Sequence, residues 1–296
     1  MHTPNPNKTL RLLFPQWQGG NNPPYYLGAK LLDWLAPAAS GPVEEVTVPA
    51  PDGETLPVEN GLVARNALLA QLQQARALID KHQPDRLVVL GGDCLVDLAP
   101  FAYLNERYDG ELAVLWVDTH PDIMTPAQFH HAHAMVLGNL LGHGDAQFVQ
   151  AVARPIKPQN LMYAGLHDPT EWEGGEMQRR GLRNVSPAEL AAHGSQPVLD
   201  WFASTGARHL AIHFDLDVLD PAAFGAVLFA QPDAAADAFE GIAQGELSIA
   251  QVVRLLGDVA QVADIVGLGI TEHLPWSALA LRDMLAKLPL IGMPAD

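Results

Sequence analysis

The chain has 296 residues, of which 48% are hydrophobic and 17% are charged, as in ordinary globular proteins with a large apolar core. Its formal net charge of −17 argues against nucleic-acid binding, which needs a basic surface, and favours cationic small-molecule partners. The single cysteine excludes an intrachain disulfide framework and indicates a reducing compartment. The sequence has neither a signal-peptide pattern nor an apolar run near the roughly 18 residues of a membrane span. These features predict a cytoplasmic protein with no membrane partner.

Predicted strands and helices alternate along the chain. Apolar runs predict strands at residues 10–14, 43–48, 86–90, 112–117, 159–165, 208–217 and 264–271. Helical spacing of apolar residues predicts helices at residues 26–35, 62–81, 97–108, 134–141, 248–262 and 276–287. Ser186 and Glu189 form a capping box around Pro187 and predict a further helix start. Residues 224–243 are weakly patterned and predict a loop with a short helix near the functional site.

This alternation favours an α/β fold in which one doubly wound, mainly parallel sheet spans residues 1–296 as a single domain. Neither an internal repeat nor a linker divides the chain. Sheets of this kind bind ligands beyond the carboxyl ends of their strands, so the residues that follow each predicted strand are the candidates for function.

A polar segment follows the predicted strand at residues 112–117, with Asp118, His120 and Asp122 at every second position. If the backbone stays extended there, the three side chains point to the same side. Carboxylates and an imidazole brought together in this way lose hydration unless a cation lies between them. Their oxygen and nitrogen atoms suit manganese, iron or zinc. The alternative is a polar loop in which Asp118 caps a helix and His120 is solvated.

Two further strand ends strengthen the metal-site interpretation. The predicted strand at residues 208–217 ends in Asp215 and Asp217, which again share a face, although aspartate is depleted in strands. The predicted strand at residues 86–90 runs into two glycines and Cys94, and these glycines permit a tight strand-to-helix turn. Ligand-type residues on three separate strand ends predict a shared metal site.

Four sequence blocks resemble the signature blocks of the ureohydrolase family: Gly-Gly-Asp-Cys at 91–94, Asp-Thr-His-Pro-Asp at 118–122, His-Phe-Asp-Leu-Asp-Val-Leu-Asp-Pro at 213–221 and Thr-Glu-His at 271–273. That family comprises arginases, agmatinases, formimidoylglutamases and other guanidino-acid hydrolases. The blocks occur in family order. The resemblance implies a three-layer α/β/α fold and a binuclear Mn²⁺ centre that hydrolyses a guanidinium group to urea and an amine. It also implies a homo-oligomer, either a trimer or a hexamer.

The resemblance implies one set of metal ligands, with Asp118 and Asp215 bridging two ions, Cys94 and Asp122 at one ion, and His120 and Asp217 at the other. In this scheme Asp122 orients the attacking water and Glu272 pairs with the guanidinium. A histidine just downstream shuttles protons, and we assign this role to His133, with His131 or His130 as alternatives. A pKa near neutrality would suit His133 to protonate the departing amine.

Cys94 departs from the family pattern, because arginases have a metal-binding histidine at this position. The thiolate would be a metal ligand in one interpretation, which shifts the preference from Mn²⁺ toward Zn²⁺, Fe²⁺ or Ni²⁺. In a second interpretation Cys94 is a buried packing residue and one metal is weakly held or absent. In a third interpretation it is a nucleophile.

A second departure concerns the substrate. Met124 replaces an asparagine that reads the amino-acid carboxylate in arginases, and Thr170 replaces the acid that reads the α-amino group. We therefore expect a guanidino or amidino substrate other than arginine, cleaved to urea or a related amide. Two alternatives stay open: a catalytically weak or inactive arginase-like protein with a partial metal site, and a deacetylase-type amide hydrolase that uses the tandem pair His130 and His131.

Overall fold

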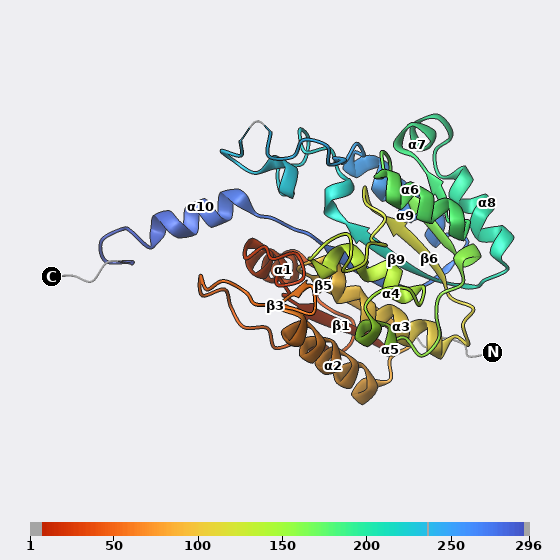
Figure 1. The fold of residues 1–296 in the computed structure, drawn as a ribbon, viewed down its shortest axis with the longest axis horizontal. Coiled ribbons are helices and arrows are strands. Elements are labelled where there is room, and N and C mark those ends of the chain that lie inside the picture. Colours follow the sequence, from red (N-terminus) through yellow and green to blue (C-terminus); the bar gives the residue numbers. More distant parts are fainter. Residues whose placement is uncertain (1–7, 236, 293–296) are drawn as a thin grey trace.

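The computed structural model describes residues 8–235 and 237–292, and its centre is an eight-stranded sheet with helices on both faces (Figure 1). The strands lie in the order β2 (Val43–Glu45), β1 (Thr9–Phe14), β5 (Arg86–Gly91), β10 (Asp264–Thr271), β9 (His209–Asp215), β6 (Ala113–Val117), β7 (Leu161–Ala164) and β8 (Arg183–Val185). Neighbouring strands are parallel throughout. The predicted α/β fold with a doubly wound, mainly parallel sheet is confirmed.

The described helices are α1 (Pro24–Leu35), α2 (Arg65–His82), α3 (Leu98–Arg107), α4 (Val136–Leu140), α5 (Ala146–Gln150), α6 (Glu171–Arg180), α7 (Pro187–His193), α8 (Gln196–Thr205), α9 (Ile249–Ala260) and α10 (Trp276–Leu285). Short 3₁₀ turns lie at Cys94–Asp97, Ala132–Met135, Pro158–Asn160, Leu216–Val218 and Leu228–Ala230. In Figure 1, α10 runs away from the rest of the molecule. Within the described residues, no helix combines the length and hydropathy needed to cross a membrane.

Strand β6 shows how the sheet separates two apolar cores. Val114 and Trp116 pack into a cluster with side chains of α2 and α3 on one face. Leu115 and Val117 pack into a second cluster with side chains of α8 and α9 on the other face. All residues of β6 are buried, as expected for a continuous apolar strand in a parallel sheet. The two cores hold the carboxyl ends of the central strands in fixed positions.

Several predicted boundaries are wrong for local reasons. The helix predicted at residues 62–81 begins only at Arg65, because Leu62 and Val63 pair with Val58 and Glu59 in a small antiparallel hairpin. The strand predicted at residues 43–48 ends at Glu45. The helix predicted at residues 134–141 is a 3₁₀ turn followed by the short α4. The capping box of Ser186 and Glu189 at the start of α7 is confirmed.

Candidate metal centre

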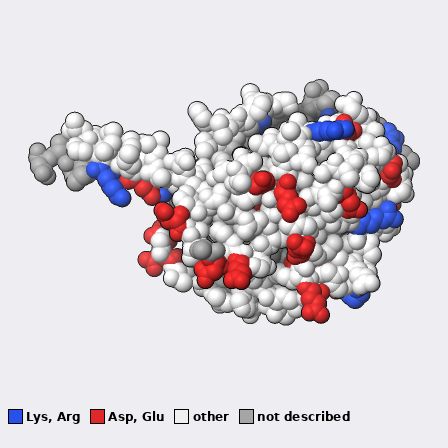
Figure 2. Space-filling view, turned by 90° about the horizontal axis from the view of Figure 1, so that it is seen from above, with Lys and Arg blue, Asp and Glu red and all other residues white. Residues whose placement is uncertain are grey.

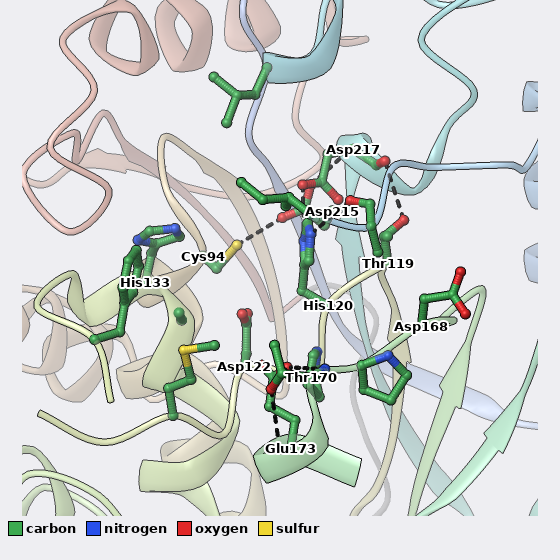
Figure 3. Close-up of a pocket in the computed structure, with 18 of the residues that line it drawn as sticks. Cys94, Thr119, His120, Asp122, His133, Asp168, Thr170, Glu173, Asp215 and Asp217 are labelled. Carbon is green, nitrogen blue, oxygen red and sulfur yellow. Dashed lines mark hydrogen bonds and ion pairs between the residues drawn. The ribbon is translucent and has the colours of Figure 1, made fainter. Parts of the chain in front are cut away.

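Four neighbouring strands end at one cavity. Strands β5, β10, β9 and β6 are adjacent and parallel, so their carboxyl ends meet at the same edge of the sheet. Cys94 follows β5, Asp118 follows β6, Asp215 ends β9 and Glu272 follows β10. These residues line a cavity of about 270 Å³ or lie directly behind it. Figure 3 shows the Cys94 side chain pointing toward Asp215.

The segment after β6 is bent rather than extended. Asp118 Oδ1 accepts a hydrogen bond from the His120 amide at 2.7 Å, and this local bond turns the chain. Asp122 then adopts a left-handed φ of 49°. The extended backbone on which the predicted alignment of Asp118, His120 and Asp122 depended is therefore absent, although Asp118 and His120 still lie in one ligand group. Asp122 nevertheless lines the cavity, and its Oδ2 atom is buried without a hydrogen-bond partner.

A similar turn follows β9. Asp215 is the last residue of the strand, and its Oδ1 atom accepts a hydrogen bond from the Asp217 amide at 2.7 Å. Asp217 reaches the cavity through this 3₁₀ turn and not along a shared strand face. The side chain of His120 lies opposite, with Nδ1 3.2 Å from Asp217 Oδ2 and Nε2 3.1 Å from the Ala243 carbonyl oxygen. Because a carbonyl only accepts, Nε2 carries the proton and Nδ1 is left to face the carboxylates, as in a metal-binding histidine.

Ligand-type atoms gather in three groups, within each of which the atoms lie no more than 4.8 Å apart: Cys94, Asp118, His213 and Asp215; Asp118, His120 and Asp217; Asp215, Asp217 and Glu272. Each pair of groups shares one aspartate, so the groups describe adjoining positions. The structure brings together all predicted metal ligands except Asp122, which lines the same cavity but joins none of the groups. Glu272, the predicted partner of the guanidinium, joins the third group.

The buried carboxyl groups need a cation to ionise together. Burial, followed by the Asp217 charge, raises the pKa of Asp118 to about 6 and that of Glu272 to about 8. Burial and the neighbouring carboxylates also hold the pKa values of Asp122 and Asp215 well above the usual range. Among the described residues, neither lysine nor arginine lines the cavity. The site therefore fits divalent metal ions, which would supply the missing positive charge.

Cys94 lies within this acidic group. Its Sγ atom is 2.8 Å from Asp215 Oδ2 and 3.5 Å from Glu272 Oε1, and its side chain is buried. Burial, with the charges of Asp215 and Glu272, raises the pKa of the Cys94 thiol well above its ordinary value. A bound metal ion would instead lower the pKa of the Cys94 thiol, because a thiol that coordinates a metal is deprotonated. The same shift argues against a free thiolate nucleophile at neutral pH.

The histidines downstream of Asp122 separate into two sets. His133 lines the cavity, and its Nδ1 atom donates to the Gly19 carbonyl at 3.0 Å. Burial lowers the pKa of His133 to about 4, so the expected near-neutral pKa is wrong. His130 is exposed and contacts the Gly61 carbonyl. His131 is half-buried, and neither it nor His130 lines the cavity.

The other end of the cavity carries the residues that depart from the arginase pattern. Met124 and Thr170 both line the cavity. The Thr170 side chain caps α6, accepting from the Glu173 amide at 3.3 Å, and its hydroxyl donates to the Glu173 carboxylate at 2.7 Å. This reciprocal capping box uses both polar side chains within the helix start. Apolar side chains from Phe129, Phe229 and other residues cover much of the remaining wall.

Three buried residues near the metal ligands were not singled out from the sequence. The Tyr25 hydroxyl donates to Glu272, and His213 Nδ1 lies 2.7 Å from Asp97 Oδ2. One signal for His213 was available, because it precedes Asp215 by two residues on β9 and therefore faces the same side. Tyr25 and Asp97 come from α1 and from the turn after β5, so only the tertiary fold brings them here.

Comparisons with known proteins agree with this geometry. The sequence model of the Arginase family matches residues 36–275. The arginase of Bacillus subtilis (strain 168) is 29% identical over 170 residues, which is 55% of this chain and 55% of that protein. The arginase of Coccidioides posadasii (strain C735) is 29% identical over 171 residues, or 53% of each protein. The matched segment thus spans about half the length of these curated relatives.

Solved structures show the same fold over nearly the whole chain. Entamoeba histolytica arginase has a TM-score of 0.77 at 20% identity, covering 91% of this chain and 92% of that one. Bacillus caldovelox arginase has a TM-score of 0.71 at 19% identity, and the match covers 95% of this chain and 99% of that one. Bacillus subtilis formimidoylglutamase has a TM-score of 0.61 at 15% identity, and the match covers 90% of this chain and 78% of that one. With the family model matching most of its length and its fold shared with solved arginases, this chain belongs to the arginase family.

Proposed function

We propose that this protein is a metal-dependent hydrolase that cleaves a C–N bond of a guanidino or amidino compound and releases urea or a related amide. One observation carries the proposal: buried carboxyl groups from separate strand ends converge with Cys94 and His120 on a cavity that neither lysine nor arginine lines among the described residues. Such a group is stable in its ionised form only around cations. Divalent metal ions bound at this position would supply the Lewis acidity that hydrolysis of a C–N bond needs.

The residues that would hold the metal are those assigned from the sequence: Asp118, Asp215, Cys94, His120 and Asp217, which lie in the ligand groups, and Asp122, which lines the same cavity. Mn²⁺ is the expected metal, and Zn²⁺, Fe²⁺ and Ni²⁺ are alternatives because of the Cys94 sulfur. When bound, the metal ions supply Lewis acidity and lower the pKa of water toward neutrality.

The side chains around the cavity carry out the remaining steps. Asp122 has an unpartnered buried oxygen that can accept from the attacking water and orient it toward the guanidinium carbon. Glu272, held by the Tyr25 hydroxyl, pairs with the cationic guanidinium. His133 carries its proton on Nδ1, so Nε2 accepts a proton from the reacting water and delivers it to the departing amine.

The cavity wall disfavours arginine as the substrate. Met124 offers no hydrogen-bond donor of the kind that reads a carboxylate, and Thr170 already pairs with Glu173 at the start of α6. An α-amino-acid headgroup would therefore gain no partner from Met124 and only a hydroxyl already in use from Thr170. We favour a guanidino compound without that headgroup, as in the agmatinase type. The net charge of −17 would attract such a cation, and Figure 2 shows acidic side chains spread over one face of the molecule.

The decisive experiment loads metal-free protein separately with Mn²⁺, Zn²⁺, Fe²⁺ and Ni²⁺. Each form is assayed for urea or ammonia release from guanidino and amidino compounds with and without an α-amino-acid headgroup, and for hydrolysis of acetylated amines. We expect turnover of a headgroup-free guanidino or amidino compound with at least one metal. Hydrolysis of acetylated amines alone, or of nothing in the panel with both metal positions filled, would contradict the proposal.

Asp122→Asn tests the assignment within the site. Asparagine tolerates the left-handed φ of 49°, so the fold should persist while turnover falls by about 10²-fold or more. Asp220→Asn is the matched control from the neighbouring sequence block. Its Oδ1 atom accepts only from the Ala222 amide at 2.8 Å among the described residues, a bond that asparagine retains. Unchanged turnover in Asp122→Asn would exclude the proposed role.

We further propose that residues 1–296 form one domain of a cytoplasmic homo-oligomer, either a trimer or a hexamer. Helix α10 and the segment after it expose apolar side chains that a partner copy could cover, with Leu281, Leu290 and Ile291 exposed by 51%, 85% and 68%. Sedimentation velocity of the full chain tests this assembly, and a single species of monomer mass across the micromolar range would contradict it.

A further inference from the structure

We propose that His213 is an additional metal ligand, held by Asp97, at the Cys94 end of the centre. A His213 nitrogen would then join the Cys94 sulfur and the carboxylates of Asp118 and Asp215 among the ligands of that position. This inference rests on the metal centre proposed above but not on the hydrolytic reaction. It also resolves the role of Cys94, because a thiolate beside an imidazole forms a recognisable transition-metal site.

The position of the His213 ring carries the proposal. The side chain is fully buried on β9, and its Nε2 atom has no hydrogen-bond partner. The nearest carboxylate oxygen recorded for Nε2 is Asp118 Oδ2 at 3.8 Å, which is too long for a hydrogen bond. One ligand atom of His213 lies within 4.8 Å of those of Cys94, Asp118 and Asp215. A buried nitrogen left without a partner beside three metal-ligand atoms is explained by a metal ion between them.

Asp97 fixes the ring in the orientation that ligation requires. Its Oδ2 atom lies 2.7 Å from His213 Nδ1, so Nδ1 donates its proton to the carboxylate. Nε2 then keeps a free electron pair. Metal-binding histidines usually donate their other ring nitrogen to a carboxylate or a carbonyl, which sets the tautomer and raises ligand basicity. The pair of Asp97 and His213 has this arrangement.

Other buried contacts hold the arrangement in place. The His213 ring stacks on Trp116, with 3.7 Å between ring centroids and 13° between planes. The Trp116 indole donates to Asp118 Oδ2 at 2.9 Å, so one side chain positions two of the ligands. Cys94 and Asp97 begin and end the same 3₁₀ turn after β5. The turn thus supplies the thiol and the partner of the histidine together.

This donor set predicts a metal preference. A ligand set that includes sulfur and nitrogen as well as carboxylate oxygen suits Zn²⁺ or Co²⁺ better than Mn²⁺, which prefers oxygen-rich sites. The adjoining group of Asp118, His120 and Asp217 contains no sulfur. We therefore expect the Cys94 position to bind Zn²⁺ more tightly than Mn²⁺.

The test titrates Co²⁺ into metal-free protein and follows its absorption spectrum, comparing the wild type with His213→Phe. Phenylalanine keeps an aromatic ring against Trp116 but offers no ligand. In the wild type, the first equivalent should give a thiolate-to-cobalt charge-transfer band in the near ultraviolet together with visible d–d bands. In His213→Phe, the visible bands should weaken and the affinity for this equivalent should fall by at least about 10-fold. An unchanged spectrum and affinity would overturn the proposal.

His209→Phe is the matched control. His209 lies on the same strand, pairs with Asp264 at 3.0 Å and stacks on Tyr108 with 4.1 Å between centroids, but it belongs to none of the metal-ligand groups among the described residues. Its replacement should leave the cobalt spectrum and affinity at wild-type values. Asp97→Asn should lower the cobalt affinity less than His213→Phe does, because asparagine can still accept from Nδ1.

X-ray absorption of the wild type with one equivalent of Zn²⁺ keeps the test valid if His213→Phe fails to fold. We expect one sulfur and at least one imidazole around zinc, and a shell of sulfur and oxygen without imidazole would overturn the proposal. Because hydrolysis is not measured, the two proposals fail separately. A protein that shows this zinc shell but hydrolyses nothing in the panel contradicts only the proposed function.

Discussion

His133 and His120, two partly buried imidazoles of the site, differ in the groups that face their ring nitrogens. His133 faces the Gly19 carbonyl, and its partial burial is the main cause that lowers its pKa to about 4. Burial also lowers the pKa of His120, but the charges of Asp217 and Asp118 outweigh that effect and raise it well above the ordinary value. The residue type is the same, and the neighbouring groups decide whether the ring is neutral or cationic in the metal-free protein.

The titration of His133 can be measured directly. Folding lowers its pKa from 6.5 to about 4, so below pH 6.5 the folded chain binds fewer protons at His133 than the unfolded chain does. The resulting stability is present above pH 6.5 and is lost as the pH falls through about 4. Nitrogen-15 NMR of the imidazoles should show His133 neutral, with its proton on Nδ1, down to at least pH 5. A midpoint near 6.5 would show that the ring is solvated.

At the scale of elements, short turns after the strands place the ligands. The 3₁₀ turns after β5 and β9 and the bend after β6 carry Cys94, Asp217 and His120, and each turn is closed by an aspartate that accepts a backbone amide. Strand β10 approaches the first turn closely at Gly269, where a Cβ atom would lie 1.9 Å from Asp97 Oδ2. Glycine is needed there because the turn and the strand are in contact.

Gly269→Ala tests this close approach. The added methyl group must push β10 or Asp97 aside, and we expect a loss of about 1–3 kcal/mol in the free energy of unfolding. Gly257→Ala, at an exposed position within α9 where an added Cβ meets nothing within 4 Å, is the matched control. It should stabilise the protein by up to about 1 kcal/mol, because alanine favours helix. Urea denaturation measures the free energy of unfolding of both variants. Equal changes in Gly269→Ala and Gly257→Ala would contradict this account.

Strands and helices were predictable from the sequence where the pattern that marks them is local. Strand β10 begins and ends at the predicted residues, and the apolar run of β6 is read directly from its composition. Helix α6 was not predicted, because its sequence is strongly polar and contains Gly174 and Gly175, so only its cap at Thr170 marks it. The hairpin that contains Leu62 was missed because its strands are two residues long and apolar residues continue into α2.

The site was predictable in its ligand types but not in its geometry. The spacing of Asp118, His120 and Asp122 suggested an extended segment, whereas the Asp118 side chain closes a turn that a period-two pattern cannot reveal. The partners Asp97 and Tyr25 come from other elements and carry no sequence signal of their own. The pKa of His133 depends on burial, which the sequence does not give.

At the scale of the whole molecule, one sheet edge collects charge that the rest of the fold cannot neutralise. The two apolar cores fix the central strands, and the strand ends then bring the carboxyl groups together irrespective of their mutual repulsion. The raised pKa values of Asp118 and Glu272 express first their burial and then that repulsion in the metal-free protein. Binding of divalent ions to the folded chain alone would stabilise it by mass action.

Anomalous X-ray scattering from crystals of the metal-loaded protein tests the central claim most directly. Data collected on either side of an absorption edge of the bound metal locate each ion independently of any assumed ligand. We predict anomalous peaks at the carboxyl edge of the sheet, among the ligand groups that contain Asp118, Asp215, Cys94 and His120. Peaks confined to the molecular surface, or none at this edge despite stoichiometric metal in solution, would contradict the account.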